Sequence, residues 1–229
     1  MMQRPAIYAH RGVSQNAREN TIHAFELALE MGVDGIELDI WKSRDGHLIV
    51  HHDPDVNGIS IQETKASELP SFVPTLTEAL DVCSELRVNI EIKSSDQDRS
   101  ATFHLAEVLV EMLRFRPEPV DRWLISSFDH DAMDRISDNA PEFQTGLLIW
   151  EEPWRSVLLR ANDQGHCALH PHESLVDGTM VQAARENGLQ LNVWTVNDVQ
   201  RAGELANFGV EGLITDIPDD IMRQLDAGT

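Results

Sequence analysis

Short apolar runs alternate with amphipathic segments along nearly the whole chain, and this alternation restricts the fold more than any other feature. Eight runs have the length of buried strands, and the segments between them repeat apolar residues at helical spacing. Strands that alternate with helices indicate parallel βα units, and eight such units in 229 residues are typical of a closed (β/α)8 barrel. The predicted strands are residues 6–10, 35–40, 87–93, 122–128, 145–150, 167–170, 191–196 and 212–216.

One segment departs from the simple alternation. Residues 47–53, with the sequence HLIVHHD, predict an additional strand after the second one, joined to it by a turn at Asp45-Gly46. The polar segment at about 54–74 is broken by Pro and Gly, and we interpret it as a short insertion. An open doubly wound sheet is the alternative fold, but no GxGxxG motif follows the first strand. We therefore expect one TIM-barrel domain over residues 1–229.

The composition limits the classes of partner. The formal net charge is -21 and the sequence pI is about 4.6, which argues against nucleic acid and against anionic lipid surfaces. No apolar run reaches the length of a membrane span, and no apolar leader precedes the first strand. We expect a cytoplasmic protein that acts on a small molecule and has no stable membrane anchor. The oligomeric state stays open, and a homodimer is one possibility.

The first three predicted strands bring ionisable side chains to their carboxyl ends, where (β/α)8 barrels carry their active sites. The second and third strands each offer two such residues at a spacing of two, which directs both side chains of a pair to one face. We expect all of these side chains to meet at one end of the barrel. They are His10 and Arg11 from the first strand, Glu37 and Asp39 from the second, and Glu91 and Lys93 from the third.

Three carboxylates that face a barrel interior repel one another and resist the loss of water. A hard divalent cation relieves this cost, and Glu37, Asp39 and Glu91 offer the oxygen ligands that Mg²⁺ or Ca²⁺ prefers. Arg11 and Lys93 are good phosphate binders, so a cation beside them predicts a site for a phosphorylated anion. The alternative is a buried ion-pair network without metal.

Two histidines from separate segments could act as general base and general acid at such a site. His10 ends the first strand, and His52 directly precedes Asp53 at the end of the additional strand. His51 and His52 would point to opposite faces of that strand, so only one of them can reach the site. This pair predicts acid/base chemistry on the phosphorylated substrate.

The ordered motifs AHRG, RENT, DGIELDIWKSRDGHLIVHHD, IEIK, VWTVND and GVEGLITDIP resemble the glycerophosphodiester phosphodiesterase family from residue 6 to about residue 218. The resemblance implies metal-dependent hydrolysis of glycerophosphodiesters, such as glycerophosphocholine or glycerophosphoethanolamine, to sn-glycerol 3-phosphate and an alcohol. In the implied mechanism the glycerol 2-hydroxyl attacks phosphorus, and water then opens a cyclic phosphate. The implied roles are His10 and His52 as the acid/base pair, Glu37, Asp39 and Glu91 as ligands of Mg²⁺ or Ca²⁺, Arg11 as a phosphate contact, Lys93 and Trp194 as pocket residues, and Glu19 as a brace for the site.

The last third of the chain offers weaker candidates. His170 and His172 lie at the end of the sixth predicted strand, and either could contact the leaving group or be structural. We keep His170 as a substrate-binding candidate. Asp216 is expected to cap the last helix. The segment PDVNGIS replaces the Leu and Arg-Thr-Thr that are familiar in the family, which leaves the head group open.

Two other functions fit the same fold. A lysophospholipase D would need an apolar channel at the barrel mouth, and the short polar insertion argues against one. A non-catalytic barrel that binds a phosphate ligand predicts the loss of a histidine or a metal ligand, and none is missing.

Overall fold

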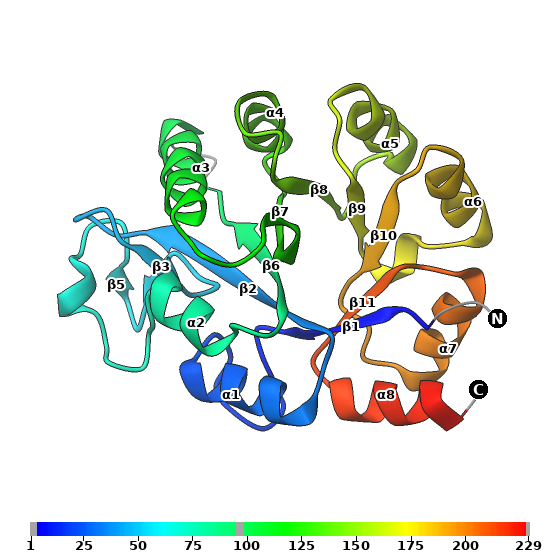
Figure 1. Cartoon of the computed structure of the whole chain (residues 1–229), viewed down its shortest axis with the longest axis horizontal. Helices are drawn as coiled ribbons and strands as arrows, with labels where there is room; N and C mark the ends of the chain where they lie inside the picture. Colours follow the sequence, from blue (N-terminus) through cyan, green and yellow to red (C-terminus); the bar gives the residue numbers. More distant parts are fainter. Residues whose placement is uncertain (1–3, 95–98, 228–229) are drawn as a thin grey trace.

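The computed structural model describes residues 4–94 and 99–227, and in these residues eight parallel strands form a closed barrel surrounded by helices (Figure 1). The barrel strands are β1 Ala6–His10, β2 Gly35–Lys42, β6 Arg87–Ile92, β7 Trp123–Ser127, β8 Gln144–Ile149, β9 Ala168–Pro171, β10 Gln190–Val193 and β11 Gly212–Thr215. They pair in the order β1-β11-β10-β9-β8-β7-β6-β2, and β1 pairs with β2 to close the ring. The predicted (β/α)8 fold is confirmed.

Every barrel strand is followed by a helix in the described chain. The helices are α1 Ile22–Met31, α2 Leu76–Val82, α3 Arg99–Arg114, α4 His130–Asn139, α5 Trp154–Asp163, α6 Gly178–Glu186, α7 Val199–Phe208 and α8 Pro218–Ala227. Local signals set the ends of α1: the Thr21 side chain accepts from the Ala24 backbone N–H, and Gly32 adopts a left-handed φ of 74°. None of the described helices combines the length and apolar character needed to cross a membrane.

Alternation along β2 shows how the fold directs charge inward. Ile36, Leu38 and Ile40 are fully buried in the apolar layer between the strands and the helices. Glu37 and Asp39 lie between them in sequence and therefore face the barrel interior. The apolar layer thus fixes the register that places two carboxylates inside the barrel.

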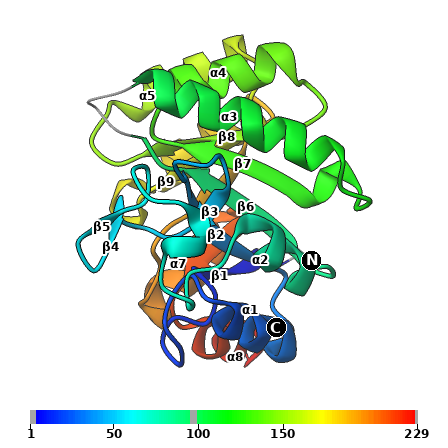
Figure 2. The ribbon, with the colours of Figure 1, turned by 90° about the vertical axis from the view of Figure 1, so that its left-hand side faces the viewer.

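The additional strand and the insertion differ in detail from the prediction. Strand β3, Leu48–Val50, pairs antiparallel with β2 and ends before the two histidines, although the His51 backbone N–H still donates to the Asp39 carbonyl at 3.1 Å. The insertion is not a plain loop: it contains the hairpin strands β4 Asp55–Val56 and β5 Ile59–Ser60, which lie beside β3 in Figure 2. A short 3₁₀ turn, Ala66–Glu68, follows the hairpin.

A small apolar cluster holds the insertion against the barrel. Trp41 from β2 and Ile49 from β3 pack with Val56 and Ile61 of the insertion, and Phe72 lies partly buried against them. This cluster is separate from the main core, so the insertion adds its own packing at the edge of the barrel mouth.

Candidate active site

Strand register brings the predicted ionisable residues together at the carboxyl end of the barrel. His10 on β1 is the register partner of Glu37 on β2, and Asp39 is the partner of Glu91 on β6. One oxygen from each of the three carboxylates lies within 4.8 Å of the others. We call the assembled group the ionic cluster; its members are His10, Arg11, Glu37, Asp39, Glu91 and Lys93.

Ion pairs account for part of the charge in this cluster. Lys93 Nζ lies 2.8 Å from Glu91 Oε1 and 3.3 Å from Asp39 Oδ1, and Arg11 Nε lies 3.3 Å from Asp39 Oδ2. The Arg11 backbone N–H donates to Glu37 Oε2 at 3.1 Å. The other oxygen of that carboxylate, Oε1, is buried and has no hydrogen-bond partner among the described residues. Two side-chain cations therefore face three carboxylates, and Glu37 Oε1 has neither an ion-pair partner nor a hydrogen-bond partner among the described residues.

The pKa values reflect this imbalance. Burial and the neighbouring Asp39 raise the pKa of Glu37 to about 8. Burial and Asp39 also raise the pKa of Glu91. Burial opposes ionisation of Asp39 as well, but the charges of Lys93 and Arg11 hold the pKa of that carboxyl below its usual value. Three buried carboxylates with an unpartnered oxygen fit a hard divalent cation better than a self-contained ion-pair network.

His10 is held by a carboxylate from the last strand's end. Its Nδ1 lies 2.7 Å from Asp216 Oδ1, and its Nε2 lies 3.9 Å from Glu37 Oε2. Burial lowers the pKa of His10, but the Asp216 hydrogen bond and the Glu37 charge outweigh it and raise that pKa. The prediction that Asp216 caps the last helix was wrong, because its oxygens accept from Ser14 and Asn197 in addition to bonding His10.

His52 lies just beyond β3, at the edge of the ionic cluster. Its Nδ1 bonds Asp53 Oδ1 at 2.8 Å, and its backbone carbonyl accepts from Trp41 Nε1 at 3.0 Å. Burial and the charge of Lys93 lower the pKa of His52. His51 instead bonds the Asp53 backbone carbonyl through its ring. The charges of Lys93, Asp39 and Arg11 act on the His52 ring, which places that ring beside the cluster.

The loop after β1 braces the cluster from a second side. Glu19 accepts from Arg11 Nη1 with both oxygens, at 2.9 and 3.0 Å. Asn20, which the sequence analysis missed, is buried and donates from Nδ2 to Asp39 Oδ2 at 2.8 Å. Its φ of 55° is left-handed, a conformation that Asn tolerates well. At Gly12, with φ 79°, a Cβ would lie 2.7 Å from the Ala24 Cβ, so this turn requires glycine.

Trp194 and His170 lie on the side of the barrel away from the ionic cluster, and they differ in how deeply they are buried. Trp194 follows β10 and donates from Nε1 to the His170 backbone carbonyl at 2.7 Å. The His170 ring has no exposed surface and lies 3.1 Å from Asn192 Nδ2, and burial lowers the pKa of His170 to about 3. The structure therefore places Trp194 at the barrel mouth and His170 inside the barrel, apart from the ionic cluster.

Three further aromatic rings line the mouth beside Trp194, a grouping that the sequence analysis did not foresee. We call the four rings the aromatic rim: Phe128, Trp150, His172 and Trp194, from the ends of β7, β8, β9 and β10. Their ring centroids lie 4.5 to 5.6 Å apart in the four contacts that join them. In the structure each ring stands one residue after its strand, but the predicted strand ends did not reveal this common position.

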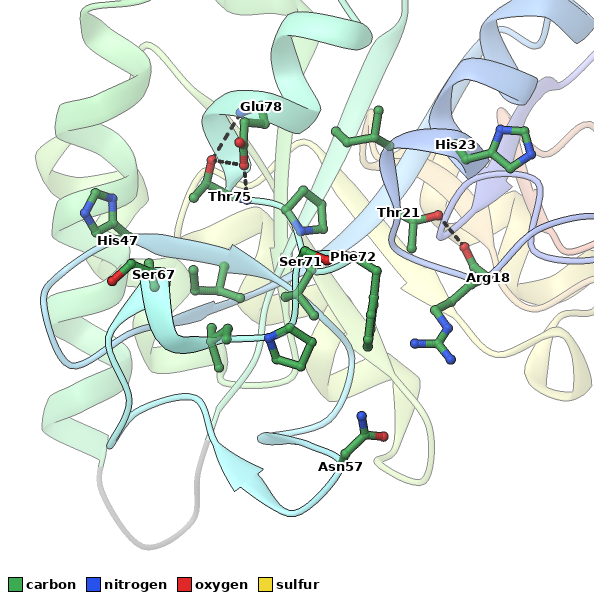
Figure 3. Close-up of a pocket in the computed structure, with 17 residues that line it drawn as sticks. Arg18, Thr21, His23, His47, Asn57, Ser67, Ser71, Phe72, Thr75 and Glu78 are labelled. Atoms are coloured by element: carbon green, nitrogen blue, oxygen red, sulfur yellow. Dashed lines mark hydrogen bonds between the residues drawn. The ribbon is translucent and has the colours of Figure 1, made fainter.

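A separate hollow lies between the insertion and the first turns of α1 and α2 (Figure 3). Its lining includes His47, Thr75 and Glu78, and the Arg18 guanidinium stacks 4.0 Å over the Phe72 ring there. No residue of the ionic cluster lines this hollow in the part of the chain that the structure describes. We therefore assign the catalytic chemistry to the barrel mouth.

Comparison with known proteins agrees with this geometry. The family model for the glycerophosphoryl diester phosphodiesterase family matches residues 10–220. A glycerophosphodiester phosphodiesterase of Caldanaerobacter subterraneus subsp. tengcongensis is 32% identical over 250 aligned positions, covering 97% of this chain and 98% of the relative.

Two solved structures share the fold across nearly the full chain. An Oleispira antarctica phosphodiesterase in complex with the product sn-glycerol-3-phosphate has a TM-score of 0.85 at 27% identity and covers 97% of each chain. A glycerophosphodiester phosphodiesterase from Parabacteroides distasonis has a TM-score of 0.89 at 26% identity and covers 100% of this chain and 99% of that one. The chain therefore belongs to the glycerophosphoryl diester phosphodiesterase family, and it is an enzyme of that kind.

Proposed function

We propose that the enzyme hydrolyses small glycerophosphodiesters to sn-glycerol 3-phosphate and an alcohol, and that the reaction depends on a divalent cation, Mg²⁺ or Ca²⁺. The observation that carries the proposal is the convergence of Glu37, Asp39 and Glu91, with oxygens within 4.8 Å of one another, beside His10. The presence of bound product in the Oleispira antarctica phosphodiesterase supports glycerol 3-phosphate as the product here.

The charged residues define where the phosphate binds. A cation held by Glu37, Asp39 and Glu91 would supply positive charge for the phosphoryl oxygens. Arg11 and Lys93 already lie against the same carboxylates, so they are positioned to bind phosphoryl oxygens from the sides. With the cation bound, the site would carry a net positive charge, which would stabilise a dianionic transition state.

The two histidines are prepared for proton transfer in the same way. His10 Nδ1 bonds Asp216 and His52 Nδ1 bonds Asp53, so each ring keeps Nε2 for the substrate. One ring removes a proton from the glycerol 2-hydroxyl as its oxygen attacks phosphorus, and the other protonates the departing alcohol oxygen. Water then opens the cyclic phosphate with the roles exchanged: the ring that lost its proton takes one from the attacking water, and the other ring returns its proton to the glycerol 2-oxygen.

The test combines metal removal with matched variants. Chelator-treated enzyme receives glycerophosphocholine with Mg²⁺ or Ca²⁺, and sn-glycerol 3-phosphate is measured by a coupled assay. We expect activity to return with the cation, and His10→Asn and Glu37→Gln to lower kcat at least about a hundredfold. The surface residues His104 and Glu85 provide the controls His104→Asn and Glu85→Gln, which should keep full activity.

Two outcomes would contradict the proposal. Folded wild-type enzyme that releases nothing from several glycerophosphodiesters with either cation would exclude this substrate class, and release from lysophospholipids in the same assay would establish the lysophospholipase D alternative. Full activity after chelation, with no response to added cation, would remove metal dependence while leaving the hydrolase activity intact.

A further inference from the structure

We propose that the aromatic rim, together with the carboxylate of Glu173, binds the alcohol part of the substrate and selects a quaternary ammonium group of the kind that choline carries. The inference rests on the proposed function, because it assigns one arm of the diester that the ionic cluster cleaves. It concerns a part of the mouth that no catalytic role requires.

The rim exposes aromatic ring surface to solvent at the carboxyl end of the barrel strands, which is the end that carries the ionic cluster. Trp150 is 49% exposed and Phe128 is 37% exposed, although rings of this size normally lose most of their surface on folding. Trp150, His172 and Trp194 contact one another, with ring centroids 4.5, 5.3 and 5.4 Å apart. The exposed ring surface of Trp150 and Phe128 offers an approaching cationic group a cation–π contact.

Two polar groups of the rim are already occupied. Trp194 Nε1 donates to the His170 carbonyl, and His172 Nδ1 bonds Ser174 Oγ at 2.8 Å. These groups are therefore not available to the hydroxyls of a polyol. A trimethylammonium group makes no hydrogen bonds and loses little by entering such a surface, so the rim matches this group better than it matches glycerol.

The charge around the rim also favours a cation. The four segments that carry the rings contain acidic residues in each and no Lys or Arg, although Arg99 and Arg160 pair with the acidic residues of the first one. The segments are residues 128–131, 150–153, 172–177 and 194–198. Glu173 directly follows His172, and its backbone N–H donates to the Trp194 carbonyl at 2.7 Å.

Glu173 provides an independent indication of a cationic ligand. Its Oε2 is buried and has no hydrogen-bond partner in the described chain. The Arg201 guanidinium donates to the backbone carbonyls of Glu173 and Val176 rather than to this carboxylate. A buried carboxylate oxygen without a partner is costly, and a positively charged group at the rim would relieve that cost.

The experiment compares three diesters that share the glycerophosphate half: those of choline, of 3,3-dimethylbutanol, which has the same shape without charge, and of glycerol. We expect wild-type kcat/KM to decrease in that order. Trp150→Leu should lower kcat/KM for the choline diester roughly tenfold more than for the glycerol diester, while Trp150→Phe keeps most of the preference. Glu173→Gln should reduce the preference for choline over dimethylbutanol.

A second measurement does not depend on turnover. Choline alone is titrated against wild type and Trp150→Leu, with intrinsic tryptophan fluorescence as the signal. Phe115→Leu is the control, because Phe115 is 84% exposed at the end of α3 and belongs to neither site. We expect a saturable change in wild type and in the control, and its loss in Trp150→Leu.

The outcomes separate the two proposals. Equal wild-type kcat/KM for the three diesters, or an equal loss for all of them in Trp150→Leu, would overturn the assignment of the rim and leave the hydrolase function standing. If no diester is cleaved, the proposed function fails. In that case a choline signal that Trp150→Leu abolishes would still support the rim, and a wild type without a signal would reject it.

Discussion

On one side of the barrel mouth, β1, β2, β6 and β11 contribute charged residues that lie on the strands or directly after them. On the other side, β7 to β10 contribute aromatic rings that begin only after the strands have ended. Glu37 and Asp39 are 3% and 1% exposed, whereas Trp150 is 49% exposed. The three carboxylates of the charged side are therefore fixed by sheet register, and the rings of the aromatic side are attached to loops.

This difference corresponds to two demands on an enzyme of this kind. Phosphoryl transfer requires charges and proton donors at positions held to a fraction of an ångström, which strands provide better than loops. Contact with a variable head group tolerates adjustment, and loops allow substitution without loss of the barrel. Changes on the charged side should therefore reduce turnover of every substrate, and changes on the aromatic side should alter substrate preference.

Asp216 tests the charged side without removing a group that touches the substrate. Asp216→Asn replaces the carboxylate that bonds His10 Nδ1 at 2.7 Å by a neutral amide, so the ring loses the charge that fixes its tautomer and raises its pKa. We expect kcat to fall by about one hundredfold with a much smaller change in KM, on the pattern of other orienting carboxylates. Steady-state kinetics on glycerophosphocholine checks this split.

The control for Asp216 is the exposed Asp121, whose Asp121→Asn variant should be unchanged. Thermal unfolding of both variants separates loss of positioning from loss of folding. A kcat within twofold of wild type in folded Asp216→Asn would show that His10 does not depend on this carboxylate.

His170 lies beneath the aromatic side, and its burial can be tested through the pH dependence of stability. Burial lowers the pKa of His170 from 6.5 to about 3, so between these values the unfolded chain binds a proton at this residue and the folded chain does not. The free energy of unfolding should therefore decrease as the pH falls below about 6.5, at up to about 1.4 kcal/mol per pH unit from this group. His170→Gln removes that contribution.

Urea unfolding of wild type and His170→Gln between about pH 6.5 and pH 4.5 measures the two slopes. Burial also lowers the pKa of His166, but that residue is present in both proteins, so the difference between the slopes isolates His170. Parallel slopes would mean that the buried ring takes up a proton in the folded state. Activity at neutral pH is not the readout, because any packing change at His170 would affect Trp194 above it.

The sequence predicts the charged side better than the aromatic side, for a physical reason. Glu37 and Asp39 are two residues apart on one strand, and so their common face follows from strand geometry alone. Asp216 and His10 are 206 positions apart, and only closure of the barrel brings them into contact. No local pattern distinguishes Asp216 from an ordinary helix cap.

The aromatic rim and Asn20 illustrate two further limits. Each rim residue, taken by itself, is an ordinary residue after a strand, and only the ring of parallel strands makes neighbours of Phe128 and Trp194. Asn20 reaches Asp39 because its backbone is left-handed, a conformation that its sequence position does not reveal. The eight strands, in contrast, followed from local apolar patterns bounded by turns.

Substitution of Trp41 should have the smallest effect on turnover, because this residue connects the insertion to the charged side through one hydrogen bond. Its ring packs in the small apolar cluster, and its Nε1 donates to the His52 carbonyl at 3.0 Å. Trp41→Phe keeps most of the packing but removes the donor, so we expect kcat to fall roughly two- to tenfold, as for the loss of one neutral hydrogen bond. KM should change less than kcat.

Trp123 is a matched control for this substitution. It is fully buried, but its Nε1 has no hydrogen-bond partner in the described residues, so Trp123→Phe removes an N–H that holds nothing in place. Both variants should lose some thermal stability from the smaller ring, and only Trp41→Phe should lose turnover. Equal kcat values in the two variants would mean that the loop carrying His52 is positioned without Trp41, and the insertion would then contribute packing alone to the charged side of the mouth.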